Sequence, residues 1–247
     1  MTEHNSGTPA SFNLKAHCYE EHARVQSDAA DWLANWLPEG RKNLRCLEFG
    51  AGTGLLTQHL LQTFDHVEAS DLWHEMIEIC GNKFPQIKHS RRDAWEPQKD
   101  TAAWDSIVSS SLLQWAPNPV ACLMNWRDML KQDGRILVGF FIHPSLPEML
   151  KTLSGKSPLQ WRTEKEWSSF FKEAGLCIVR MDRDTRRYQY ENALKFWKSL
   201  HGTGATVSRG MHPSEMMRLL KNYESQFGDE SGVFATWTFC RAELRRA

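Results

Sequence analysis

Three alternating glycines, Gly50, Gly52 and Gly54, separate a short apolar run from a segment with a helical pattern. Glycines at the end of a strand let the backbone approach a ligand closely, and the helix that follows offers unpaired N–H groups at its N-terminus. The spacing is G-x-G-x-G rather than the G-x-G-x-x-G of dinucleotide sites. Glu48, two residues before the first glycine, would repel a pyrophosphate but attract an ammonium group. This pattern favours a cationic, amino-acid-bearing nucleotide such as S-adenosylmethionine over a glycine turn that binds no ligand.

Three more polar side chains, Asp71, Asp93 and Ser109, come at the ends of further strands of the expected sheet. In an open parallel sheet, ligands bind beyond the carboxyl ends of the strands, beside the first strand. Asp71 can accept hydrogen bonds from both hydroxyls of a ribose, although it could instead cap the helix after it. Asp93 could accept from an adenine amino group, with the backbone N–H of Ala94 beside it, or be a solvated loop acid. The residues expected to contact the cofactor are Gln26, Glu48, Gly50, Ala51, Gly52, Asp71, Leu72, Asp93, Ala94 and Ser109.

A regular alternation of strands and helices positions these residues. Apolar runs of strand length, each followed by a stretch of different period, occur at residues 44–49, 66–70, 87–90, 105–109 and 135–142. The alternation predicts an α/β fold with a mostly parallel sheet and helices on both faces. Residues 191–228 have helical periodicity between a strand at 176–190 and a last strand at 233–240, so we expect a helical lid inserted there.

We expect one folded domain at residues 12–247, preceded by a disordered polar tail at residues 1–11. The domain should begin with a helical cap at residues 12–38. Within this cap, Tyr19 and Gln26 share one helical face. They could line a pocket there or simply lie on the surface.

The composition argues against several classes of protein. No apolar run reaches the ~20 residues of a membrane helix, the six cysteines contain no CxxC pair, and the ten histidines show no ligand spacing. We therefore expect a cytoplasmic protein with reduced thiols, no metal site and no membrane contact. Lys and Arg number 13 against 19 Asp and Glu in residues 1–150, but 17 against 11 in residues 151–247. The basic later segment indicates an anionic partner unless the asymmetry is fortuitous, and without a strongly basic face or an N-P-P-Y motif we expect no nucleic acid.

Across residues 40–142 the chain resembles the class I S-adenosylmethionine-dependent methyltransferases, through the glycine motif with Glu48, Asp71 and Asp93. The resemblance implies a seven-stranded Rossmann-like sheet in the order 3-2-1-4-5-7-6, with the last strand antiparallel. Most of the chain further resembles the BioC-type methyltransferases, which methylate the free carboxyl of malonyl-acyl carrier protein at the entry to biotin synthesis. This narrower resemblance rests on the motifs Phe12-x4-His17-x-Tyr19-x2-His22-Ala23-x2-Gln26, Leu113-Gln114-Trp115, Ser145-Leu146-Pro147-Glu148 and Ala193-Leu194-x4-Ser199-Leu200-x-Gly202-x-Gly204-Ala205.

The resemblance implies an O-methyltransferase for the free carboxyl of a malonyl thioester. The alternatives are a methyltransferase for another small carboxylic acid and a non-catalytic S-adenosylmethionine-binding protein. A carboxylate with a pKa of about 4 is ionised at neutral pH, so we expect no general base, and orientation and exclusion of water remain as the contributions of the protein. Arg186, Arg187 and Arg209 are candidates to grip the malonyl carboxylate, and we favour Arg187. The acidic carrier protein would dock on the basic later segment, and the expected substrate-binding residues are Tyr19, Gln114, Trp115, His143 and Arg187.

Overall fold

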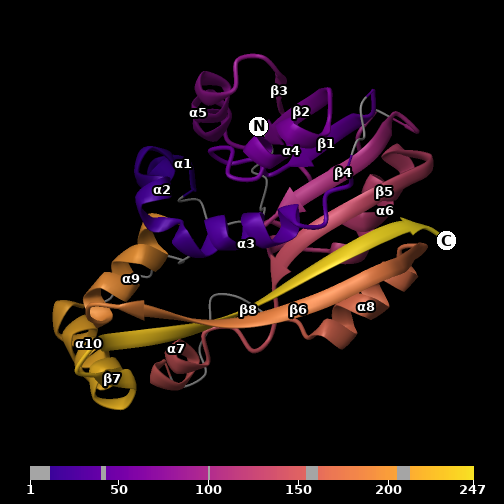
Figure 1. Cartoon of the computed structure of the whole chain (residues 1–247). Helices are drawn as coiled ribbons and strands as arrows, with labels where there is room; N and C mark the ends of the chain where they lie inside the picture. Colours follow the sequence, from indigo (N-terminus) through magenta and orange to yellow (C-terminus); the bar gives the residue numbers. More distant parts are fainter. Residues whose placement is uncertain (1–11, 40–42, 100, 154–160, 205–211) are drawn as a thin grey trace.

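The computed structural model describes residues 12–39, 43–99, 101–153, 161–204 and 212–247. Figure 1 shows a twisted sheet with helices against it. Two long antiparallel strands, β6 and β8, extend beyond the parallel strands, and we call this pair the β6–β8 hairpin although two helices connect its strands. The expected tail at residues 1–11 and the candidate Arg209 lie outside the described residues.

The sheet has the order β3-β2-β1-β4-β5-β8-β6, and a short β7 pairs with β8. Strands β1 to β5 are parallel, and β8 runs antiparallel to both β5 and β6. The predicted fold class and strand order are confirmed, with the two-residue β7 as an addition. The strands are β1 Arg45–Phe49, β2 His66–Asp71, β3 Lys88–Arg91, β4 Trp104–Ser110, β5 Leu130–Phe141, β6 Leu176–Tyr190, β7 Gly228–Asp229 and β8 Gly232–Arg246.

Local signals in the sequence fix several helix starts. The side chain of Asn118 accepts a hydrogen bond from the backbone N–H of Ala121 at the start of α6. At α8, Thr163 and Glu166 form a capping box in which each side chain bonds the other's backbone. The helices are α1 Phe12–Lys15, η1 Ala16–Cys18, α2 Tyr19–His22, α3 Arg24–Ala34, α4 Thr57–Thr63, α5 His74–Lys83, η2 Leu113–Trp115, α6 Pro119–Met129, α7 Pro147–Thr152, α8 Glu164–Glu173, α9 Ala193–Gly202 and α10 Pro213–Phe227.

Helices cover both faces of the sheet. On one face, Leu33 of α3 and Leu60 of α4 pack in the same core cluster as Val108 of β4. On the other face, the ring of Trp126 from α6 stacks on Phe49 at a centroid distance of 5.0 Å. These two cores hold the carboxyl ends of β1, β2 and β4 at a common edge.

The N-terminal region differs from the single, once-broken helix that the periodicity predicts. It consists of four pieces, α1, η1, α2 and α3, because the backbone leaves the α-helical conformation at Lys15, Cys18 and Ala23. Only α3 buries a continuous apolar stripe. The pieces before it turn along the edge of the sheet, between α5 and α9 (Figure 1).

The distal part of the β6–β8 hairpin carries a second core. Phe196 of α9 and Tyr223 of α10 stack at 5.2 Å, in a cluster that also holds Trp237 and Phe239 of β8. Strand β6 is continuous over the range that the sequence predicts, with one register shift between Ile178 and Arg180. Both α9 and α10 therefore follow β6 and precede β8, in the position expected for the helical insert.

Candidate active site

A cleft lies at the carboxyl ends of β1, β2 and β4. Its larger part encloses about 690 Å³ of empty space, open solvent included, and runs from Asp71 and Asp93 to Trp115. A smaller part adjoins it and reaches Glu48 and Gln26. The two parts share the lining residues Tyr19, Gly50, Gly52, Ser110 and Ser111.

The glycine turn between β1 and α4 forms the floor of this cleft. Gly50, Gly52 and Gly54 have φ angles of 67°, 56° and 93°, which residues that carry a Cβ rarely adopt. A Cβ on Gly52 would meet no atom within 4 Å, so this glycine borders open space on its cleft side. By contrast, a Cβ on Gly54 would lie 2.5 Å from the ring of Phe84, so that glycine allows α5 to pack.

Asp71 connects the end of β2 to the glycine turn. One carboxylate oxygen accepts the backbone N–H of Gly52 at 2.9 Å, and the other accepts the N–H of Trp73 at 3.0 Å. Burial raises the pKa of Asp71, and these backbone hydrogen bonds oppose the shift. The side chain is 8% exposed and lines the cleft. Each oxygen retains a further lone pair, so Asp71 can order the loop and accept a pair of hydroxyl groups at the same time.

Glu48 lies beneath the smaller part of the cleft and is 1% exposed. Its carboxylate accepts a hydrogen bond from the hydroxyl of Thr57 at 2.6 Å. Burial, reinforced by the nearby Asp71 charge, raises the pKa of Glu48 to about 8 even though the Thr57 hydrogen bond lowers it. A cation in the cleft would reverse this shift, because it stabilises the ionised carboxylate.

The opposite end of the cleft has an apolar slot with an acid beside it. Leu72, Trp95 and Leu112 line it together with Asp93 and Ala94. Asp93 accepts the backbone N–H of Trp95 at 3.0 Å, which fixes the turn after β3. This arrangement suits a flat heterocycle with an amino group at its edge.

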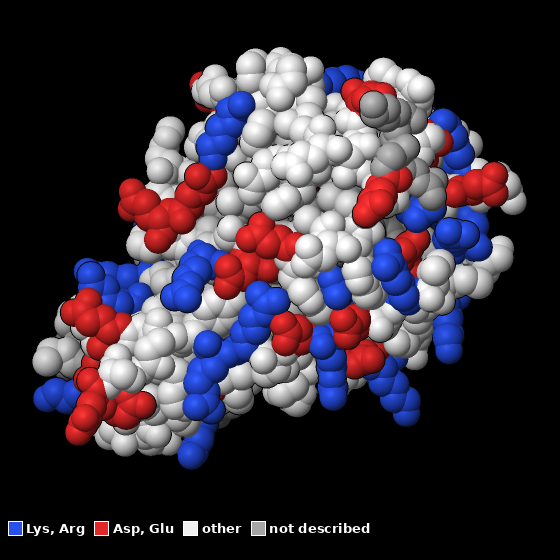
Figure 2. All heavy atoms as spheres, in the orientation of Figure 1, with Lys and Arg blue, Asp and Glu red and all other residues white. Residues whose placement is uncertain are grey.

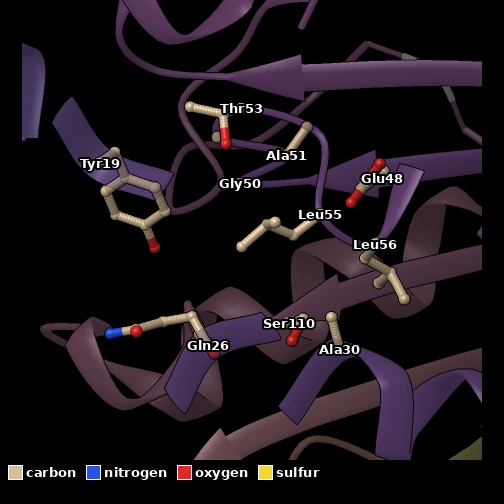
Figure 3. Close-up of a pocket in the computed structure, with 12 residues that line it drawn as sticks. Tyr19, Gln26, Ala30, Glu48, Gly50, Ala51, Thr53, Leu55, Leu56 and Ser110 are labelled. Atoms are coloured by element: carbon tan, nitrogen blue, oxygen red, sulfur yellow. The ribbon is translucent and has the colours of Figure 1, made fainter. Parts of the chain in front are cut away.

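The N-terminal helices close the cleft from the side. In Figure 3, Tyr19 and Gln26 come from these helices and lie across from the glycine loop. Burial and the charge of Asp71 raise the pKa of the Tyr19 hydroxyl, so it stays protonated and can donate. Glu20 forms an ion pair with Lys83 of α5, which ties α2 to the far wall.

Four of the expected site residues lie elsewhere than predicted. Ser109 is 1% exposed, and its hydroxyl donates to the carbonyl of Phe49 at 2.9 Å, so it holds the sheet together and does not line the cleft. His143 is exposed, and its backbone N–H donates to the carbonyl of Arg162. Gln114 is buried behind the cleft wall and donates to the carbonyl of Ser111 at 2.8 Å, while its Oε1 has no partner among the described residues.

Arg187 is the fourth, and it lies on the wrong face of the β6–β8 hairpin. It pairs in register with Thr236, whose hydroxyl donates to Glu148 of α7. Its guanidinium lies over the ring of Phe234 at 3.9 Å. The neighbouring Tyr188 donates to Asp28 of α3 instead, which defines the opposite face as the one turned toward the N-terminal helices.

Some lining residues were not expected from the sequence. Phe12 lines the cleft and meets the ring of Trp115 edge-on at 5.6 Å. Ser110 and Ser111 also line it, and their buried hydroxyls have no hydrogen-bond partner among the described residues. The sequence could have indicated these two serines, because they follow Ser109 directly in a run of three at the end of β4. Of the three, only Ser109 was predicted to contact the cofactor.

These features fit an S-adenosylmethionine-sized ligand. The open space at Gly52, the two unpartnered serine hydroxyls and the acids at both ends provide room, donors and charge in one cleft. In the described part of the chain, no group of three or more His, Cys, Asp or Glu side chains is placed to hold a metal ion. No helix among the described residues is long and apolar enough to cross a membrane.

Comparisons with known proteins agree with this geometry. The chain matches the methyltransferase domain family over residues 19–181. It is 26% identical to a malonyl-acyl carrier protein O-methyltransferase from Paenibacillus sp. (strain JDR-2), over 92% of this chain and 93% of that protein. It is 28% identical to the biotin biosynthesis bifunctional protein BioCD from Bordetella avium (strain 197N), over 95% of this chain and 51% of that longer protein. The crystal structure of the YcgJ protein from Bacillus subtilis has the same fold, with a TM-score of 0.67 and 14% identity over 89% of this chain and 99% of that one.

Proposed function

The chain belongs to the methyltransferase domain family, and from this premise we propose that it transfers the methyl group of S-adenosylmethionine to a malonyl thioester. The acceptor atom is an oxygen of the free malonyl carboxylate, and the thioester is carried by an acyl carrier protein. The product is the malonyl methyl ester, and the reaction belongs to biotin synthesis. The likeness of nearly the whole chain to malonyl-acyl carrier protein O-methyltransferases supports this acceptor.

The observation that carries the methyl-donor half of the proposal is the pair of acids around Gly52. Asp71 is buried at the end of β2 with free lone pairs for the ribose, and Glu48 lies at the end of β1 for the ammonium group. Asp93 and Ala94 are assigned to the adenine edge, in the slot enclosed by Leu72 and Leu112. The cofactor supplies an electrophilic methyl group on a sulfonium, and the chain supplies its orientation.

The side chains of the cleft favour a carboxylate acceptor over a neutral hydroxyl. None of the described residues that line it is a His, Lys or Cys, and its acids Glu48, Asp71 and Asp93 are assigned to the cofactor. A carboxylate needs no such base, because it is ionised at neutral pH. What it needs is alignment with the methyl group, which can contribute ~7–11 kcal/mol in well-arranged systems. We assign this alignment to Tyr19, Gln26 and Trp115, which line the cleft on the side of the N-terminal helices and of η2.

Charge neutralisation makes a closed site useful. The reaction joins a cation and an anion, so exclusion of water lowers its barrier. The N-terminal helices and the α9–α10 insert are the elements that we assign as lids. The six cysteines form no disulfide among the described residues, which suits a reaction in the cytoplasm.

The test is methyl transfer from radiolabelled cofactor to malonyl-acyl carrier protein, malonyl-CoA and free malonate. The proposal predicts base-labile label on a malonyl thioester and little on free malonate. Transfer to malonate alone would identify a methyltransferase for a small carboxylic acid. Cofactor binding without transfer to any of the three acceptors would contradict the enzymatic assignment.

A further inference from the structure

Helix α9 presents a compact basic face to the outside of the molecule. Leu194, Lys195 and Lys198 are exposed along it, and Leu194 is 45% exposed. Lys198 has no ion-pair partner among the described residues. Lys195 has only the exposed Glu191 at 4.0 Å, an arrangement that contributes little. We call Leu194, Lys195 and Lys198 the α9 face.

The C-terminal end of the same helix touches the wall of the cleft. The hydroxyl of Ser199 donates to the carbonyl of His22 at 3.2 Å, and a Cβ on Gly202 would lie 1.9 Å from the ring of His22. Gly204, just after the helix, also lies close to Phe12, since a Cβ there would be 3.0 Å from its ring. Phe12 itself lines the cleft beside Trp115. The α9 face is therefore connected to the acceptor end of the cleft through the C-terminal end of α9 and its contacts with His22 and Phe12.

A further cation, Arg24, lies where α3 meets the β6–β8 hairpin. Arg24, exposed at the start of α3, holds its guanidinium 5.5 Å from the ring of Tyr188 on β6. Figure 2 shows Lys and Arg side chains around α9 and along the lower part of the molecule, interspersed with Asp and Glu. Glu20, on the neighbouring α2, is already paired with Lys83. An acidic surface with an apolar centre would complement this combination of two lysines and one leucine.

We propose that the α9 face is the docking site of the acidic acyl carrier protein, which presents its thioester-linked malonyl group to the cleft past Phe12 and Trp115. This inference rests on the proposed function, since it concerns the carrier of the same acceptor. It narrows the docking surface from the basic later segment as a whole to one face of one helix. The lysines attract and orient the carrier by charge, and Leu194 provides the apolar contact.

The experiment compares two double charge reversals of equal size. Lys195→Glu/Lys198→Glu alters the α9 face, and Lys165→Glu/Lys172→Glu alters two exposed lysines of α8, which lies in the same basic segment at the other end of the hairpin (Figure 1). Each variant is assayed with malonyl-acyl carrier protein and with malonyl-pantetheine, which carries the same acyl thioester without a protein. Melting temperatures check that both variants fold.

The α9 variant should raise the KM for malonyl-acyl carrier protein by about tenfold, because charge complementarity governs encounter. It should leave kcat/KM for malonyl-pantetheine within about twofold of the unaltered protein, and the α8 variant should leave both acceptors within that range. The KM of the unaltered protein for the carrier should also rise with salt, and that dependence should flatten in the α9 variant.

Three outcomes would overturn the inference. An unchanged KM for the carrier in the α9 variant would place docking elsewhere, and equal losses in both variants would indicate an unspecific effect of net charge. A matching loss with malonyl-pantetheine would show that the α9 change disturbs the cleft itself. If instead the unaltered protein methylates neither acceptor, the proposed function fails, and this result is distinct from the other three.

Discussion

Two sides of the cleft, which we call its methyl-donor end and its acceptor end, are built in different ways. The methyl-donor end consists of Glu48, the glycine turn, Asp71 and Asp93, which follow three strands within a stretch of fewer than fifty residues. The acceptor end is formed by Phe12, Tyr19 and Gln26 of the N-terminal helices with Trp115, and α9 supports it from behind.

The difference lies in what holds each end in place. At the donor end, side chains bond to backbone atoms of the adjacent strands, as Asp71 does to Gly52. At the acceptor end, whole helices press against one another, as α9 does against His22 and Phe12. A change at the donor end should therefore alter one ligand contact, whereas a change at the acceptor end should move an element.

The largest expected effect is that of Asp71→Ala on cofactor affinity. The change removes a buried carboxylate together with its bonds to two backbone N–H groups. Hydrogen bonds to charged groups contribute ~1.5–3 kcal/mol, so calorimetry should show a cofactor Kd raised about 100-fold. Asp71→Asn keeps an oxygen for Gly52 and should lose about tenfold. An unchanged Kd in the alanine variant would show that Asp71 only shapes the loop.

Gly202→Ala should break the acceptor end. The new Cβ would lie 1.9 Å from the ring of His22, so the ring must shift or α9 and α2 must separate. Overpacking of this kind costs ~1–3 kcal/mol, and denaturant titration should show that loss of stability. The KM for the malonyl thioester should rise about tenfold by the same displacement.

The matched control is the double variant Gly202→Ala/His22→Ala. Removal of the His22 ring makes room for the new methyl group, so most of the lost stability should return. If the double variant is no more stable than Gly202→Ala alone, the glycine is required for another reason than the close approach of His22.

Glu48 links the donor end to pH. With a pKa of about 8, this carboxyl is protonated at neutral pH in the absence of cofactor, and a bound cation lowers the pKa. Cofactor binding near pH 7 should therefore release up to one proton, and affinity should rise toward pH 8, above which the cofactor's own ammonium begins to lose its proton. Calorimetry in buffers of different ionisation enthalpy measures the release, and Glu48→Gln should abolish it.

The same shift affects stability without cofactor. Between the ordinary value of 4.5 and the folded-state pKa of about 8, the folded protein holds a proton that the unfolded chain has lost. The contribution of Glu48 to the free energy of unfolding therefore falls as the pH rises through this window. Glu48→Gln should flatten this part of the pH profile; an unaltered profile would contradict the assigned pKa.

The smallest expected effect is that of Tyr188→Phe. This change tests α3, which contacts the β6–β8 hairpin on one side and lines the cleft on the other. The hydroxyl of Tyr188 donates to Asp28 of α3 at 2.8 Å, and loss of one such bond should lower the free energy of unfolding by ~1 kcal/mol. Cofactor affinity should not change, because the opposite side of α3 lines the cleft through Gln26. A cofactor Kd that changes with stability would show that α3 transmits the disturbance.

Much of the donor end could be predicted from the sequence because its determinants are local. An acid or a glycine at the end of a parallel strand necessarily faces the ligand edge, as Asp71 and Gly52 do. The predicted place of Ser109 in the cleft differs from the structure for a related reason. Strand β4 continues to Ser110, one residue beyond the predicted end, and successive side chains of a strand point to opposite faces. The hydroxyl that reaches the cleft is therefore that of the next serine.

The acceptor end could be predicted only in part, because its geometry depends on contacts between distant segments. Alternation along β6 separates Arg186 from Arg187, but the covering of one hairpin face by α3 decides which of them faces the helices. His143 follows β5, yet its backbone joins the loop at Arg162 and leaves its side chain exposed. The place of Phe12 beside Trp115 depends on the close approach of Gly204, far away in sequence.

The division between the two ends is tested most directly by kinetic constants measured on Asp71→Ala and Gly202→Ala side by side. The cofactor Kd and the KM for malonyl-acyl carrier protein are determined for each variant. The structure predicts a crossed result: Asp71→Ala weakens the cofactor and leaves the KM for the thioester near its original value, and Gly202→Ala does the reverse. Equal losses of both quantities in both variants would contradict the separation of donor and acceptor ends.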